Sequence, residues 1–218
     1  MKKVKCVFVV DRFVNMATRV VNNECQWVLD GEGLATVKFD GTSCFIQNDI
    51  LYKRWNRTLL KQVAAKMRRN PSLSIDESMF KPVPDGAIAC ESSFDKKTLH
   101  WPYWVPVLNT PADAKHNEAF LKKHDWQDGT YELIGPGIQG NKHGLLSCEL
   151  HKHGDVLLQI ERLDFDGLSD FMRSLPYEGV VWHHPDGRMA KLRRSHFNFA
   201  WGDPDPRDDQ EARARFVP

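Results

Sequence analysis

The sequence lacks any apolar run that approaches the ~20 residues of a membrane-spanning helix. It also lacks an excess of either charge, because its 30 basic and 29 acidic residues nearly cancel. The first ten residues have neither the length nor the small-residue cleavage site of a signal peptide. From these absences we expect neither a membrane span nor a secretory leader, and we expect an intracellular, cytoplasmic protein.

The cysteines are few and scattered, at Cys6, Cys25, Cys44, Cys90 and Cys148. Their number is odd and no Cys-x-x-Cys pair occurs, so neither a zinc ribbon nor a redox centre is indicated. We expect reduced and mostly buried thiols. The histidine pairs at 151/153 and 183/184 have no second cluster of matching ligands, and we predict no zinc site from them.

A net charge of +1 is not by itself the signature of a nucleic-acid-binding protein. Basic residues nevertheless cluster locally. One cluster is Lys53, Arg54, Arg57, Lys61, Lys66, Arg68 and Arg69, and another is Lys191, Arg193 and Arg194. A solvated helix face explains part of the first cluster, but the second falls in a predicted strand.

The length of 218 residues suits one large domain, or one domain with small additions, and is sufficient for a sizeable core. Strand-like patterns dominate and predict strands at residues 3–10, 18–21, 25–29, 34–39, 43–52, 87–90, 103–108, 130–134, 156–162, 179–184 and 188–192. The turn dipeptide Asn22-Asn23 predicts a hairpin between the second and third of these. Helical spacing predicts helices at 56–69, 114–124 and 165–175.

The most informative run is residues 36–46, where Lys38 and Asp40 stand two apart in a β-prone segment that breaks at Gly41. Side chains at i and i+2 of a strand share a face, so an amine and a carboxylate are expected to point into one cleft, with Phe39 on the opposite face. A lysine is a nucleophile where its site favours the neutral amine. An ordinary hairpin turn remains the alternative explanation of this run.

Three further segments place charged residues in or beside apolar strands. They are Glu132 in Tyr-Glu-Leu-Ile-Gly at 131–135, Glu178 in Glu-Gly-Val-Val-Trp-His at 178–183, and Lys191 with Arg193 in Ala-Lys-Leu-Arg at 190–193. Each segment alone is typical of a solvated strand edge. Their order along the chain is what carries information.

That order, Lys-x-Asp-Gly, Glu-Leu-Ile-Gly, Glu-Gly-Val-Val and Lys-Leu-Arg, resembles motifs I, III, IV and V of the covalent nucleotidyltransferases, the superfamily of polynucleotide ligases and mRNA capping enzymes. Residues 80–84, 103–107, 132–145 and 178–194 are similar to the vertebrate 5′-to-3′ RNA ligase family, within a resemblance that runs from about residue 25 to about residue 201.

The resemblance implies an α+β fold, namely a nucleotidyltransferase (ATP-grasp-like ligase) catalytic domain with mainly antiparallel sheets flanked by helices. We expect this domain at residues 1–203 and an acidic and basic tail at 204–218. DNA ligases and capping enzymes typically add an oligonucleotide-binding barrel after motif V. About two dozen residues follow Lys191 here, too few for that barrel, and we expect a catalytic domain alone.

The resemblance also implies a reaction on RNA that uses ATP and Mg²⁺, with Mn²⁺ as an alternative metal. Lys38 would attack the α-phosphate of ATP to give a lysyl-AMP intermediate. The AMP would pass to the 5′-phosphate of an RNA, and a 3′-hydroxyl would displace it to seal the strand. A covalent intermediate divides one difficult step into easier ones.

Residue roles follow from the same resemblance. Lys191 would neutralise the α-phosphate with Arg193 beside it. Glu178 and Glu132 would hold Mg²⁺, although in related ligases the motif III acid instead binds the ribose. Asp40 would orient the amine of Lys38 or a metal-bound water.

The basic stretch after the first sheet would bind the RNA end. Arg54 suits a 5′-phosphate because a guanidinium binds phosphate with two parallel hydrogen bonds, and Arg57 is the second candidate. The sequence departs from the wider superfamily at two places. Arg193 replaces a lysine, and no adenine-stacking aromatic is evident at 156–159, where Leu158 is expected to pack on the base.

Other functions stay open at this point. A DNA ligase, a capping-like enzyme or a protein-modifying adenylyltransferase would carry the same motifs. A nucleic-acid-binding relative without activity is a further alternative, although Lys38, Glu178 and Lys191 are all intact.

Overall fold

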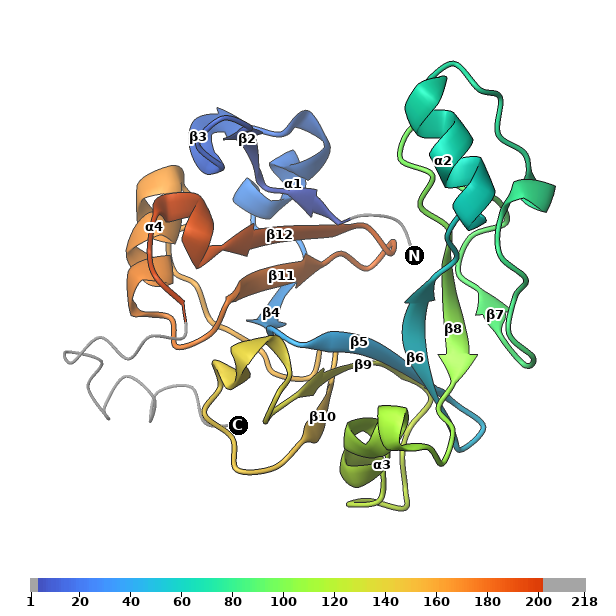
Figure 1. The fold of residues 1–218 in the computed structure, drawn as a ribbon. Coiled ribbons are helices and arrows are strands. Elements are labelled where there is room, and N and C mark those ends of the chain that lie inside the picture. The colour runs from blue at the N-terminus through green and yellow to red at the C-terminus, as the bar shows by residue number, and fades with distance from the viewer. Residues whose placement is uncertain (1–3, 202–218) are drawn as a thin grey trace. The chain divides into compact units, whose positions relative to one another are not determined.

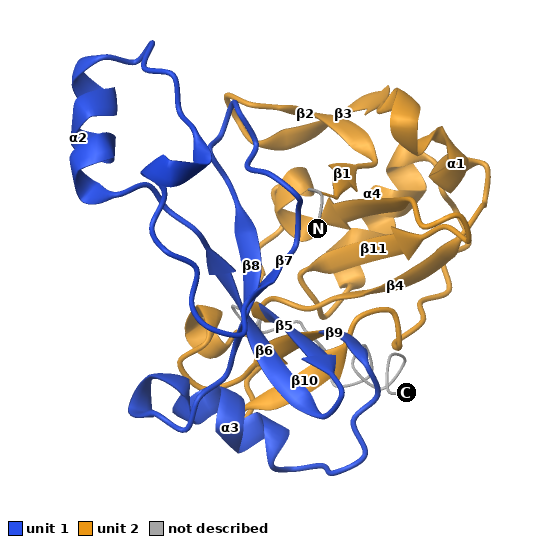
Figure 2. Ribbon diagram, turned by 90° about the vertical axis from the view of Figure 1, so that its right-hand side faces the viewer, with its two compact units in different colours: residues 1–2, 43–130 blue, residues 3–42, 131–218 orange. Residues whose placement is uncertain are grey.

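The computed structural model describes residues 4–201, and the tail expected at 204–218 lies outside the described residues. The chain divides into two compact units (Figure 2). Among the described residues, unit 1 comprises 43–130 and unit 2 comprises 4–42 and 131–201. The architecture is α+β with mainly antiparallel sheets and few helices, as predicted (Figure 1).

Unit 2 contains a four-stranded sheet in the order β1-β12-β11-β4. Its strands are β1 (Lys5–Cys6), β12 (Met189–Arg193), β11 (Gly179–His183) and β4 (Leu34–Lys38). The β1 strand runs parallel to β12, and the other two pairs are antiparallel. The sheet thus joins segments from the beginning and the end of the sequence.

Two antiparallel pairs accompany this sheet. In one, β2 (Phe8–Asp11) pairs with β3 (Met16–Val21). In the other, β9 (Gly129–Ile134), which begins at the boundary with unit 1, pairs with β10 (Glu149–Lys152). The second pair carries Glu132, the acid of the second motif.

The core of unit 2 forms between this sheet and the helix α4 (Phe165–Ser174). Asp164 caps the helix, because its side chain accepts the N–H of Gly167 at 2.7 Å. Leu168 and Met172 are four residues apart, so they lie on one helix face, and both are fully buried. They belong to the same core cluster as Val180 of β11.

Short helices complete unit 2. They are α1 (Gln26–Leu29) and the 3₁₀ turns η1 (Asn23–Cys25), η4 (Gln139–Asn141) and η5 (Arg194–Phe197).

Unit 1 contains four antiparallel strands that pair in the order β5-β6-β8-β7. They are β5 (Thr42–Gln47), β6 (Ile50–Asn56), β8 (Pro102–Pro106) and β7 (Ile88–Ala89). Its helical elements are α2 (Lys61–Arg69), α3 (Ala114–Phe120), η2 (Glu77–Met79) and η3 (Pro111–Asp113). A small aromatic core contains Phe80, Trp101 and Tyr103.

Two strand predictions were wrong, each because of a local turn. Residues 25–29 form a helix rather than a strand, because the side chain of Asn22 accepts the N–H of Glu24 and starts the turn η1. The hairpin is therefore formed by β2 and β3. Residues 43–52 divide into two strands, because Asn48 and Asp49 both adopt positive φ and form a tight turn.

Two further boundaries also differ from the prediction. The strand expected at 156–162 is reduced to one bridge between Thr36 and Leu157. The helix expected at 56–69 begins only at Lys61, because β6 extends through Asn56. No helix of residues 4–201 is long and apolar enough to cross a membrane.

Candidate active site

Three neighbouring strands of unit 2 bring charged residues to one end of the sheet. Gly179 of β11 lies opposite Lys38 of β4 on one side and opposite Arg193 of β12 on the other. Glu178 directly precedes Gly179. Strand pairing thus gathers an amine, a carboxylate and a guanidinium from three distant parts of the sequence.

Glu178 connects the two cations. Its Oε2 forms an ion pair with Nζ of Lys38, and its Oε1 lies 2.9 Å from Nε of Arg193. The second contact is an ion pair without hydrogen-bond geometry, because that Nε has no hydrogen-bond partner among the described residues. The side chains of Lys38 and Glu178 are only 19% and 13% exposed, so each compensates a partly buried charge of the other.

Gly179 is required for this arrangement. A Cβ atom at this position would lie 2.0 Å from the carbonyl oxygen of Leu192 and 2.9 Å from the Cα of Arg193. A glycine in a strand often marks such a close backbone approach. The Glu-Gly sequence of this motif therefore has a steric reason, because the glycine lets β11 bring Glu178 against β12.

Gly41 serves the same purpose for the first motif. A Cβ atom there would lie 2.2 Å from the carbonyl oxygen of Leu133. Its N–H donates to Oε1 of Glu132 at 3.1 Å, and Oε2 of Glu132 lies 2.9 Å from Nε2 of His153. Both oxygens of Glu132 are thus engaged by the protein, and this acid positions the turn that follows Lys38.

Asp40 lies beyond the end of β4, so the strand geometry expected for Lys38 and Asp40 stops before Asp40. Its Oδ2 accepts a hydrogen bond from the indole N–H of Trp201 at 3.0 Å and lies 3.3 Å from Nζ of Lys142. The amine of Lys38 is instead paired with Glu178 and donates to the carbonyl of Phe39 at 3.4 Å.

The glycine-rich loop after β9 contacts the backbone that follows Lys38. Nε2 of His143 accepts the N–H of Asp40 at 3.1 Å, and the side-chain amide of Gln139 donates to the carbonyl of Gly41 at 3.4 Å. As an acceptor, Nε2 carries no proton, so the neutral ring is protonated at Nδ1. Burial lowers the pKa of His143 to about 4, which keeps the ring neutral at neutral pH.

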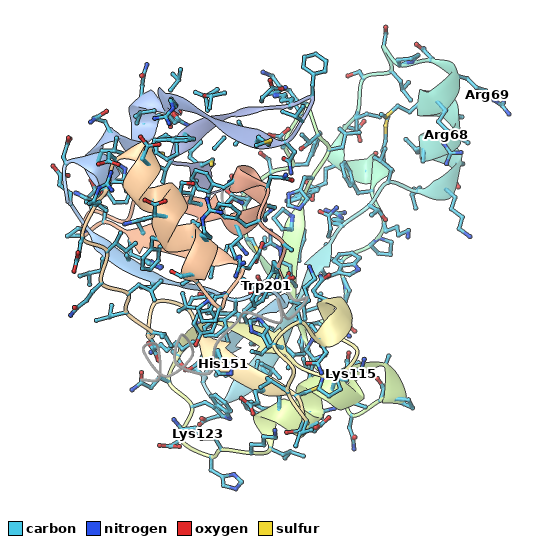
Figure 3. The ribbon with its side chains drawn as sticks, turned by 90° about the vertical axis from the view of Figure 1, so that its left-hand side faces the viewer. Arg68, Arg69, Lys115, Lys123, His151 and Trp201 are labelled. Atoms are coloured by element: carbon cyan, nitrogen blue, oxygen red, sulfur yellow. The ribbon has the colours of Figure 1, made fainter. Side chains whose placement is uncertain are left out.

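Aromatic rings surround the contact between His143 and the backbone of Asp40. The ring of Phe39 lies 4.6 Å from that of His151 and 5.8 Å from that of Tyr177, between centroids. The ring of His143 meets Trp201 edge-on at 5.1 Å, and Figure 3 labels His151 and Trp201 in this unit. The segment after Lys38 is therefore held by packing as well as by hydrogen bonds.

The last motif has the strand geometry that was predicted. Lys191 and Arg193 alternate in β12 with the fully buried Ala190 and Leu192, so the two cations share the opposite face. Leu158 is 7% exposed and belongs to the core of unit 2, and its N–H donates to the carbonyl of Ala35 at 2.9 Å. Its contact with an adenine stays a prediction.

The two arginines expected to bind substrate lie in unit 1 and differ from each other. The guanidinium of Arg54, on β6, lies 5.4 Å from the ring centre of Trp104. Arg57 is only 7% exposed, donates to the carbonyl of Lys81 at 2.7 Å and pairs with Glu77.

Arg57 also lies over the ring of Trp101 at 4.4 Å from its centre. These contacts describe a buried guanidinium that stabilises unit 1, so of the two arginines only Arg54 fits a role toward substrate.

Comparison with known proteins shows which family this chain resembles. A model of the family described as RNA ligase 1 matches residues 107–213. Proteins named RNA ligase 1 from Rattus norvegicus and Pongo abelii are 26% and 27% identical, over 94% of this chain and 83% of theirs. The protein of the same name from Danio rerio is 25% identical over 77% of this chain and 68% of its own length.

The chain is similar to the RNA ligase 1 family over most of its length. The matched range of the family model includes Glu132, Glu178 and Lys191, and the resemblance stated from the sequence motifs is thereby confirmed. Lys38 and Asp40 lie outside that range, but the alignments with the RNA ligase 1 proteins cover most of the chain.

The residues of this chain fit one of the two ways in which proteins bind Mg²⁺. No group of three or more His, Cys, Asp or Glu side chains is arranged to hold a metal ion within residues 4–201. Mg²⁺, however, often takes one or two carboxylates and completes its shell with phosphate oxygens and water. Glu178 fits that mode, whereas Glu132 is engaged by Gly41 and His153.

Sequence reasoning missed the side chains that hold Asp40 and Glu132, namely Lys142, His143, His153 and Trp201. For Lys142 and His143 the signal in the sequence was the composition of the glycine-rich segment 135–144, which predicts a loop without indicating what it contacts. His153 was considered only as a metal ligand.

Proposed function

We propose that this chain is an ATP-dependent RNA ligase that joins 5′-phosphate and 3′-hydroxyl RNA ends through a lysyl-AMP intermediate, built on a nucleotidyltransferase catalytic domain. The observation that carries the proposal is the cluster of Lys38, Glu178 and Arg193 at one end of the sheet of unit 2. It occurs in a chain similar to proteins named RNA ligase 1.

The first step is nucleophilic attack by Lys38. Nζ forms a bond to the α-phosphorus of ATP, and the bond to the β-phosphate oxygen breaks to release pyrophosphate. An ammonium is unreactive, so Nζ must first lose a proton. Glu178 is the carboxylate that pairs with this amine and is its acceptor in our proposal. When ATP binds, its phosphate groups supply new anionic partners for Lys191 and Arg193.

Lys191 and Arg193 neutralise the charge that develops on the α-phosphate oxygens. Both project from one face of β12, and positioned cations lower the barrier to phosphoryl transfer by stabilising charge in the transition state. Arg193 already faces Glu178 across 2.9 Å, so it is held in place before ATP binds. A bound Mg²⁺, held by Glu178, would neutralise the pyrophosphate leaving group.

Glu132 and His143 position the reacting amine through the backbone of Asp40 and Gly41. Glu132 and His143 hold the N–H groups of Gly41 and Asp40, the two residues that follow Phe39. A fixed peptide keeps Lys38 at the end of β4, and positioning of this kind supplies much of the rate enhancement in phosphoryl transfer.

The later steps act on RNA. Arg54 holds the 5′-phosphate in our proposal, since a guanidinium binds phosphate with two parallel hydrogen bonds. AMP passes from Lys38 to that phosphate, and the 3′-hydroxyl of the other end then displaces AMP. Ribose 2′-hydroxyl groups would distinguish RNA from DNA at the site.

The decisive experiment uses ATP labelled at the α-phosphate. The protein with Mg²⁺ should retain label after denaturation, as an acid-labile and alkali-stable phosphoramidate, and Lys38→Ala should abolish it. Lys5→Ala is the matched control, since Lys5 lies in the same sheet but is exposed. Label that persists in the Lys38→Ala protein overturns the proposal.

A second assay separates RNA sealing from the related activities. Nicked or single-stranded RNA with a 5′-phosphate should be sealed much faster than an all-DNA nick. Equal rates on both would favour a DNA ligase, and label that is transferred only to protein acceptors would favour a protein-modifying adenylyltransferase.

A further inference from the structure

The helix α2 of unit 1 presents a basic face without acidic partners. All four of its charged residues are basic and exposed, namely Lys61, Lys66, Arg68 and Arg69. None of them forms an ion pair with, or a side-chain hydrogen bond to, another residue of the range 4–201. Residues 50–75 contain no Asp or Glu at all. Figure 3 shows Arg68 and Arg69 on the outside of this helix.

The charges lie on the side of α2 that faces solvent. The half-buried positions are Val63, Ala64 and Met67, whose spacing of three and four residues defines one helix face. The basic residues occupy the opposite face together with Gln62 and Ala65. The packing of the helix therefore uses its apolar side and leaves the whole basic side open.

Helix stability does not explain this charge pattern. Cations in the last turn favour the helix dipole, which accounts for Lys66, Arg68 and Arg69. Lys61, however, stands in the first turn, where a cation is unfavourable and where no acidic residue is present. An i,i+4 ion pair would also require an acid on this helix, and none exists.

We propose that α2 is a docking surface for the phosphate backbone of RNA, the substrate class of the proposed function on which this inference rests. From Lys61 to Arg69 the helix rises by about 12 Å, long enough to follow several consecutive phosphates of one RNA strand. The arginine forks suit phosphate oxygens, and long flexible lysines accommodate a backbone of varied sequence. Contacts of this kind position RNA without reading its sequence.

Two other polyanionic partners fit less well. A membrane-surface helix inserts a large apolar face rich in Trp, Phe or Leu, whereas the apolar face here holds Val63, Ala64 and Met67 and is half-buried in the protein. A protein interface is typically enriched in aromatic residues and depleted in lysine at its centre. The open face of α2 has no aromatic residue.

The test compares two variants with the same change in net charge. One carries Lys61→Gln, Lys66→Gln, Arg68→Gln and Arg69→Gln, since glutamine keeps the helix propensity. The control carries Lys96→Gln, Lys97→Gln, Lys122→Gln and Lys123→Gln, at exposed positions of the same unit. Binding of a fluorescein-labelled RNA with a 5′-phosphate is measured by anisotropy between 50 and 300 mM salt, and folding by circular dichroism.

The α2 variant should bind RNA about tenfold or more weakly at low salt, with a salt slope reduced by about 0.7 for each lost contact. The control should retain most of its affinity, and both should form the ATP-derived adduct on Lys38 as the unchanged protein does. Sealing by the α2 variant should fall at low RNA concentration and recover at saturating RNA.

Three results would overturn the proposal: unchanged RNA binding by the α2 variant, an equal loss in both variants, or α2-dependent binding to vesicles of anionic phospholipid without binding to RNA. If the unchanged protein forms no adduct with ATP but binds RNA through α2, the proposed ligase function fails while this surface assignment stands.

Discussion

Nε2 of His143 lies 3.1 Å from the backbone nitrogen of Asp40 and accepts its N–H, so a side chain of the glycine-rich loop fixes the peptide two residues after Lys38. His143 and Asp40 are about a hundred residues apart in sequence. Through this contact the loop holds the backbone next to Lys38. The first two predictions concern His143.

His143→Ala should destabilise the protein and slow adduct formation. The substitution leaves the partly buried N–H of Asp40 without its acceptor, at a cost of about 1–3 kcal/mol. For a chain of this size each kcal/mol corresponds to ~2–4 °C in the melting temperature. His143→Gln, whose amide oxygen is an acceptor, is the control and should recover part of both losses. Full activity of His143→Ala would show that the contact is dispensable.

Stability should fall as the solution becomes acidic through the histidine range. Burial lowers the pKa of both His143 and His196 to about 4, below the ~6.5 of an unfolded chain. The unfolded state therefore binds more protons between pH 6.5 and 4. The contribution of these two histidines to the free energy of unfolding is fully present above pH 6.5 and is lost as the pH falls to about 4.

Urea unfolding of the unchanged protein and of His143→Gln with His196→Gln, at pH 7.5, 6, 5 and 4, measures this effect. The double variant should show a smaller decrease in stability across the window. Parallel curves for the two proteins would mean that other groups dominate the acid response.

Gly179→Ala should cost about 2–4 kcal/mol, because the new methyl group meets a backbone oxygen that cannot yield. A Cβ atom there lies 2.0 Å from the carbonyl oxygen of Leu192. Gly187→Ala is the control, since a Cβ there meets nothing within 4 Å and only its φ of +88° is strained. Its cost should be about 1 kcal/mol. Denaturant unfolding compares the two, and equal costs would contradict the steric account of the Glu-Gly motif.

Arg54→Ala and Arg57→Ala should have opposite phenotypes. Arg54→Ala should fold and form the Lys38 adduct, but transfer AMP poorly to a 5′-phosphorylated RNA. Arg57→Ala should lower the melting temperature, because it removes a buried guanidinium that holds the carbonyl of Lys81 and the ring of Trp101. Melting curves and a two-step assay with labelled ATP separate the two effects. A stable Arg57→Ala protein that stalls before transfer would restore the substrate role first expected for Arg57.

Glu178→Gln should retain the fold and lose adduct formation by at least ~10²-fold, because in the proposed mechanism the amide would neither accept the proton of Lys38 nor supply a charged ligand to Mg²⁺. Omission of Mg²⁺ should lower the rate in the unchanged protein, and excess chelator should abolish adduct formation. Glu149→Gln is a suitable control, because it removes a carboxylate that pairs with His151 instead of with Lys38. Adduct formation by Glu178→Gln at the normal rate would show that this acid has another role.

The strands that carry the motifs were largely predictable from local patterns. The β12 strand alternates buried and partly exposed positions, so its two cations share a face as expected. The predicted hairpin at 18–29 failed, because the side chain of Asn22 starts a helical turn that a turn dipeptide also permits. Similarly, Asn48 and Asp49 adopt positive φ within a run that otherwise suits a continuous strand.

By itself, the sequence determined the motif residues, the α+β class and the family resemblance, because each depends on residue types and spacings within short segments. Only the tertiary structure decided which partners those residues have. Lys38 pairs with Glu178 rather than with Asp40, since β4 ends at Lys38 and β11 lies beside it. It also decided that Arg57 is buried. Strand pairing and burial join residues that are far apart in sequence, and no local pattern records them.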